Sequence, residues 1–167
     1  MKNSLSGGKT AEYGLLLALA LVLSYVESFI PLSFAVPGVK LGLANIVVLF
    51  ALYRTGAVPA LILSLLRVLL VSFMFGNAFA LVYSLSGAIL SWGLMSLLKK
   101  SGRFSPVGIG IAGGVAHNIG QLLCAMTVLE TGRLAYYLPV LLVSGTVAGT
   151  LIGLAAGMTI KRLPPTP

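Results

Sequence analysis

Long runs of apolar residues, separated by short polar or glycine-containing turns, follow one another along most of the chain. A membrane-spanning helix needs about 20 apolar residues, because each residue advances about 1.5 Å through a hydrocarbon core of about 30 Å. Five runs have about this length, and they cover residues 11–30, 57–75, 78–98, 106–129 and 136–160. No run alternates with the two-residue period of a strand. The pattern therefore predicts an all-α membrane protein.

A sixth apolar run, Leu41 to Tyr53, is too short to cross the membrane comfortably unless residues before it extend it. It overlaps the stretch Pro37 to Asn45, where the proline fixes φ and Gly38 is free to turn the chain. We interpret this stretch as a re-entrant turn that feeds a membrane helix. Lys40 then lies just above that helix, either as a snorkelling side chain or as part of a solute site.

Composition agrees with a membrane protein, since 58% of the 167 residues are hydrophobic and 8% are charged. A soluble domain carries about 25% charged residues. With the short run included, we predict six transmembrane helices in a single bundle over residues 11–160. A polar lead (1–10) precedes this bundle and a short tail (161–167) follows it.

The basic residues predict the orientation of the helices. Six spans place both termini on one side, and the side that holds more lysine and arginine faces the cytoplasm. If the termini are inside, the inner side holds eight basic residues and the outer side two: Lys2, Lys9, Arg54, Lys99, Lys100, Arg103, Lys161 and Arg162 against Lys40 and Arg133. We therefore expect cytoplasmic termini in the cell membrane. Scattered basic residues do not indicate nucleic acid, despite the net charge of +8.

Polar side chains inside apolar runs are the best candidates for a functional site, because lipid makes them costly. The candidate substrate-binding residues are Glu27, Lys40, Asn45, Arg67, His117, Asn118 and Gln121. Arg67 lies near the middle of its run, and His117 and Gln121, four apart, share a helix face. Glu27 is the acidic residue deep enough to pair with Arg67, at depths that differ by roughly 9 Å.

Two interpretations of these polar residues stay open. They form either a network that fixes helix register or a site for a polar or anionic headgroup. The second is favoured because two cations, Arg67 and Lys40, outnumber Glu27.

Catalysis finds little support in the sequence. The chain has no aspartate, and its three acidic residues, Glu12, Glu27 and Glu130, lie in different segments. They cannot form a carboxylate pair or a Mg²⁺ cluster, and His117 has neither a nucleophile partner nor companions for zinc. We therefore expect no enzyme, metal or cofactor. Because no Walker motif is present, uphill transport would draw its energy from a partner or an ion gradient.

Small residues at four-residue spacing predict close helix contacts. The last run carries one such face, made of Gly145, Gly149, Gly153 and Gly157. We expect this face to pack inside the protein, with a groove for a partner subunit as the alternative. Gly14 and Ala18 form a similar pair in the first run, for which an internal contact and a partner helix are both open.

Three motifs together resemble one family: Pro37 to Ile46, Ser64 to Leu69, and Ala116 to Gln121. From about Gly14 to Gly157 the chain is similar to the Gx transporter family, also labelled heptaprenyl diphosphate synthase component I. This family resembles the substrate-binding S components of energy-coupling factor (ECF) transporters.

The resemblance implies six helices in the bilayer, outer loops that close over a small vitamin-like or redox-cofactor-precursor solute, and a separate transmembrane coupling protein with ATPase subunits. It also implies that Gly14 and Ala18 contact the coupling protein. The synthase label fits less well, because polyprenyl diphosphate synthases hold Mg²⁺ with aspartate-rich motifs. The alternative is a non-catalytic membrane subunit associated with heptaprenyl or polyprenyl diphosphate, quinone or electron-transfer functions.

Overall fold

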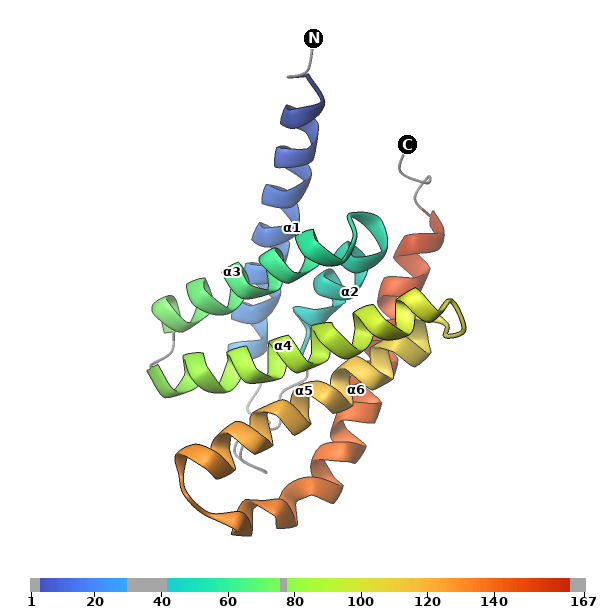
Figure 1. Cartoon of the computed structure of the whole chain (residues 1–167). Coiled ribbons are helices and arrows are strands. Elements are labelled where there is room, and N and C mark those ends of the chain that lie inside the picture. The colour runs from blue at the N-terminus through green and yellow to red at the C-terminus, as the bar shows by residue number, and fades with distance from the viewer. Residues whose placement is uncertain (1–3, 30–41, 76–77, 163–167) are drawn as a thin grey trace.

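A computed structural model describes residues 4–29, 42–75 and 78–162, and all the regular structure in these ranges is helical (Figure 1). The helices are α1 (Ser4–Ser28), α2 (Asn45–Arg54), α3 (Ala57–Phe75), α4 (Ala78–Ser101), α5 (Pro106–Val128) and α6 (Leu138–Arg162). A short 3₁₀ helix, η2 (Gly132–Tyr137), leads into α6. The all-α prediction is confirmed.

Five helical segments are long and apolar enough to cross a membrane: α1, α3, α4, α5, and η2 together with α6. The sixth helix, α2, has 10 residues, which at 1.5 Å per residue is about half the thickness of the hydrocarbon core. The short second run is therefore a short helix, and length alone identifies five spans rather than six. Residues 30–41, which were expected to extend it and which include Lys40, lie outside the described part of the chain.

The short helix α2 lies in the middle of the molecule, where α1, α3 and α6 pack against it (Figure 1). Its buried residues are Asn45, Val47, Val48, Leu49, Phe50, Ala51 and Leu52. Because these residues occupy every side of the helix, α2 is a core helix, unlike the longer helices that expose an apolar face.

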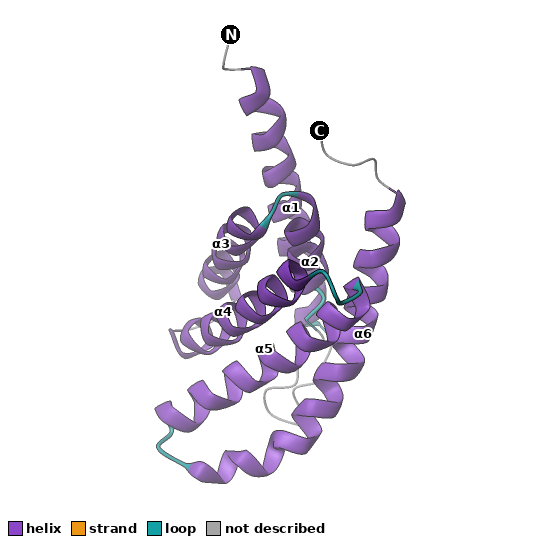
Figure 2. Ribbon diagram, turned by 45° about the vertical axis from the view of Figure 1, so that its right-hand side comes forward, coloured by secondary structure: helices purple, strands orange, loops and turns teal. Residues whose placement is uncertain are grey.

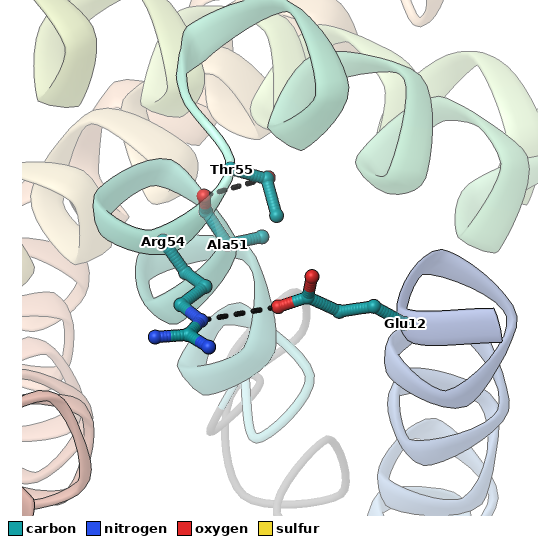
Figure 3. A network of polar contacts seen from close by, with 4 residues as sticks. All are labelled: Glu12, Ala51, Arg54 and Thr55. Carbon is teal, nitrogen blue, oxygen red and sulfur yellow. Dashed lines mark hydrogen bonds and ion pairs between the residues drawn. The ribbon is translucent and has the colours of Figure 1, made fainter. Parts of the chain in front are cut away.

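The C-terminal end of α2 is tied to α1 by an ion pair. Nε of Arg54 donates to Oε1 of Glu12 at 3.2 Å (Figure 3). The next residue, Thr55, donates from its hydroxyl to the carbonyl oxygen of Ala51 at 2.9 Å. The same carbonyl also accepts from the backbone N–H of Thr55 at 2.7 Å, so the hydroxyl adds a second bond at the end of α2.

A lysine from α4 secures the same end of α2. Nζ of Lys99 donates to the carbonyl oxygen of Leu52 and lies 5.1 Å from the centroid of the Tyr53 ring. A cation near helix-terminal carbonyls is favourable because those carbonyls carry partial negative charge. Two neighbouring helices, α1 and α4, thus hold the end of α2 with charged side chains.

Helices α5 and α6 approach closely along glycines. The four glycines of the last apolar run are all buried: Gly145, Gly149, Gly153 and Gly157. A Cβ on Gly149 would collide with the backbone of Gly110, and a Cβ on Gly153 would lie 2.5 Å from Cα of Val107. This glycine face of α6 is therefore covered by α5 of the same chain.

Figures 1 and 2 show the N-terminal end of α1 and the C-terminal end of α6 toward the same side of the molecule. Helix α5 begins near that side and ends at the opposite one. Its N-terminus is well formed, because the hydroxyl of Ser105 accepts from the backbone N–H of Gly108 at 3.2 Å and Pro106 occupies the first turn.

Because Ser101 and Thr131 flank the 23 residues of α5, we predict that they lie on opposite sides of the membrane. In a Cys124→Ser background, Thr131→Cys should react with an impermeant maleimide on intact cells. Ser101→Cys should react only after permeabilisation, because its loop is the more basic one. Labelling of both positions from one side would contradict a spanning α5.

Candidate functional site

One group of polar side chains joins the end of α1 to the start of α2. Oε1 of Glu27 accepts from the backbone N–H of Gly42 at 2.6 Å, and Oε2 accepts from Leu43 at 3.2 Å. Gly42 has φ +68°, a conformation that glycine adopts without strain. The carboxylate thus lies at the partly positive end of α2 and uses both oxygens to hold the entry to that helix.

Arg67 of α3 reaches the same region. Its Nη2 donates to Oδ1 of Asn45 at 3.3 Å, and Asn45 is buried. Glu27 attracts the guanidinium electrostatically. Within the described residues, however, the two groups form no ion pair, and the buried Nε of Arg67 has no acceptor. The ion pair between Arg67 and Glu27, which their estimated depths in the membrane allowed, is therefore not formed.

The N–H groups of Arg67 that do not bind Asn45 determine which ligand groups this region suits. A guanidinium carries five N–H groups, and the bond to Asn45 uses one of them. Because both oxygens of Glu27 are occupied by backbone N–H groups, the arginine retains donors for another acceptor. A carboxylate or phosphate matches that donor set best.

A second group of polar side chains lies between α4 and α5. His117 and Gln121 of α5 are 7% and 1% exposed, and both lie against Gly87 of α4. A Cβ at Gly87 would be 2.8 Å from Cγ of Gln121 and 3.0 Å from Cε1 of His117. Among the residues described, neither Nε2 nor Oε1 of Gln121 has a hydrogen-bond partner, and neither does Oγ of Ser91, one turn further along α4. We call Ser91, His117 and Gln121 the α4–α5 seam.

Asn118 faces α6 instead. Its Nδ2 donates to the carbonyl oxygen of Leu141 at 2.8 Å and to Oγ of Ser144 at 3.2 Å. These two bonds use both N–H groups of the amide. The geometry of Asn118 thus fits the alternative interpretation, a polar contact that fixes helix register.

The predicted site residues therefore fall into separate places. Glu27, Asn45 and Arg67 come together at the entry to α2, His117 and Gln121 lie in the seam, and Asn118 contacts α6. Lys40 is outside the described residues. The sequence analysis missed Ser91 and Gly87, although a glycine and a serine four apart inside an apolar run were a signal that one face of that helix is not simply apolar. No three His, Cys, Asp or Glu side chains gather as a metal site among the residues described.

Gly14 and Ala18 lie on an exposed face of α1. A Cβ added at Gly14 would meet nothing within 4 Å. In the described part of the chain, the pair is thus open rather than covered by a neighbouring helix.

The fold and these polar groups define an all-helical protein with long apolar helices, compatible with several passes through a membrane, and with charged side chains inside the bundle. The chain belongs to the family described as heptaprenyl diphosphate synthase component I, whose model matches residues 16–159. This confirms the family resemblance of the sequence motifs. No curated protein and no solved structure matches the chain.

We predict that Glu27→Gln loosens the entry to α2, because an amide offers one neutral acceptor oxygen where the carboxylate offers two charged ones. Hydrogen bonds to charged groups contribute about 1.5–3 kcal/mol each, so the free energy of unfolding should fall by roughly 1–3 kcal/mol. Thermal melting of the purified protein measures the change. Glu130→Gln, at an exposed position, is the control, and equal melting of both variants would show that Glu27 contributes little.

Proposed function

We propose that the chain is the substrate-binding, S component-like membrane subunit of an ECF-type transporter. It crosses the membrane six times with both termini in the cytoplasm, binds a small vitamin-like or redox-cofactor-precursor solute from the outer side, and works with a transmembrane coupling protein and ATPase subunits. The observation that carries this proposal is Arg67, a cation with spare hydrogen-bond donors inside the bundle.

Arg67 supports a solute with an anionic group. A charged side chain inside a membrane domain is costly, and such residues usually serve substrates or ions. At the entry to α2 the glutamate is engaged by backbone N–H groups and Asn45 is a neutral acceptor. A solute carboxylate or phosphate would fill the donors of Arg67 that the protein leaves open.

The exposed pair on α1 supports a partner subunit. Small side chains four apart leave a shallow groove, and a second helix packs there at short distance without help from the hydrophobic effect. We assign Gly14 and Ala18 to the contact with the coupling protein, because no described helix of this chain covers Gly14.

A second candidate is a non-catalytic membrane subunit associated with heptaprenyl or polyprenyl diphosphate, quinone or electron-transfer functions. The family description favours it, since it names a component of a prenyl diphosphate synthase. A diphosphate would also suit Arg67. The accessory role follows from the chemistry: the sequence contains no aspartate, so it holds no aspartate-rich Mg²⁺ motif.

We predict that Arg67→Ala abolishes solute binding while the fold survives, because the variant removes the charge that faces the anionic group. Native mass spectrometry of protein extracted from its own membranes should show a bound small molecule on the wild type and on the exposed control variant Arg103→Ala, but not on Arg67→Ala. Melting curves establish that each variant is folded. A folded Arg67→Ala protein that keeps the bound mass excludes Arg67 from the site.

We predict that leucine at both Gly14 and Ala18 fills the groove on α1 and prevents assembly without affecting the solute site. Copurification from cells should recover an ATPase module with the wild type. The control is Val22→Leu, at an exposed position on the same helix, and it should recover the same amount. The double variant should recover at least several-fold less of the ATPase module. A wild-type yield for the double variant would place the coupling surface elsewhere. Recovery of a soluble synthase in place of ATPases would favour the second candidate.

A further inference from the structure

The α4–α5 seam contains polar atoms that the bundle leaves without partners. Gln121 is 1% exposed and Ser91 is 2% exposed, so solvent reaches neither side chain. In the part of the chain that the structure describes, neither polar atom of the Gln121 amide is hydrogen-bonded, and the Ser91 hydroxyl is not bonded either. The two side chains meet different positions of the facing helix: Gln121 lies against Gly87 of α4, and a Cβ at Gly113 of α5 would lie 3.3 Å from Oγ of Ser91.

Leaving these groups unpaired is unfavourable, because a buried amide without partners loses its hydration and gains nothing in return. The seam has glycine on both sides, which allows the helices to come close, yet apolar side chains at the same positions would pack there without that cost. The neighbouring amide shows the contrast. Asn118, three residues before Gln121, has two acceptors on α6 for its two N–H groups.

We propose that Gln121 forms a binding subsite for a neutral group that presents a hydrogen-bond donor beside an acceptor, such as a primary amide, lactam or imide. This proposal rests on the proposed function, because the group belongs to the solute that the subunit binds. An amide side chain with a free N–H and a free carbonyl pairs with such an edge through two parallel hydrogen bonds.

The subsite is closed in this structure. Because Gln121 lies directly over Gly87, the solute group enters as the side chain swings away from α4, and the unpaired amide makes the closed state less stable than a bound one. The absence of a Cβ at Gly87 gives the side chain room to take this position.

The first test compares two buried amides in protein stripped of small molecules, with native mass spectrometry as the check. Gln121→Met keeps the size of the side chain and removes its unpaired polar atoms, so it should melt at or above the wild-type temperature. Asn118→Leu removes an amide with partners and should melt roughly 2–8 °C lower. If Gln121→Met melts as low as Asn118→Leu, the amide has partners in the native protein and the proposal is overturned.

The second test uses nicotinamide and nicotinate, which differ only in carrying an amide or a carboxylate on the same ring. Nicotinamide at millimolar concentration should raise the melting temperature of the wild type by roughly 2–4 °C and leave Gln121→Met unchanged. No shift of the wild type, or equal shifts of both proteins, overturns the subsite. Nicotinate tests Arg67 instead, and it should raise the melting temperature of Gln121→Met but not that of Arg67→Ala. If nicotinate stabilises neither variant, the anionic site of the proposed function is contradicted. The nicotinamide result does not depend on that outcome.

Discussion

A helix of ten residues inside a bundle of longer helices must find partners for its own ends. The first N–H groups and the last C=O groups of any helix have no partner within it, and within a membrane domain water does not supply one. At the start of α2 the first N–H groups donate to the carbonyls of the preceding turn, residues 42–44, and the Glu27 carboxylate holds that turn by accepting from two of its backbone N–H groups. At the end of α2, Lys99 donates to the carbonyl oxygen of Leu52. These bonds connect α1 and α4 to the two ends of α2.

The turn before α2 also affects Arg67, the cation of the proposed site, because it engages the glutamate that attracts the guanidinium, Glu27. The turn before α2 engages both oxygens of Glu27, and Arg67 keeps one hydrogen bond to Asn45 and an electrostatic attraction to the carboxylate. Within the described residues, Nε of Arg67 therefore has no acceptor, which is the feature on which the proposed anionic site rests.

The lengths of the apolar runs predicted the long helices, because run length in a membrane chain translates directly into helix length. The run 57–75 corresponds to α3 residue by residue, and the run 106–129 ends one residue after α5. The pairing of polar side chains was not predictable in the same way. Glu27 binds backbone N–H groups that become available only when the chain turns before α2, which no side-chain pattern reveals.

Ser91 was missed for a different reason. A serine inside a helix usually donates to a carbonyl three or four residues earlier, as Ser24 does to Ala20, and so carries little information. The sequence did show that Gln121 and His117 share a face, yet it could not show which neighbouring helix that face meets.

Helix α5 carries two buried amides that differ in their hydrogen bonding, Asn118 and Gln121. Its face toward α6 is close-packed through glycines, and Asn118 on that side donates both N–H groups to α6. Its face toward α4 is equally close at Gly120, where a Cβ would lie 2.7 Å from the Ser86 carbonyl oxygen, yet Gln121 beside it pairs with nothing. Close packing alone therefore does not account for the glutamine, because leucine or methionine would fill the space without losing hydration. A buried amide that weakens the empty protein is best explained by a bound state in which its donor and acceptor are used.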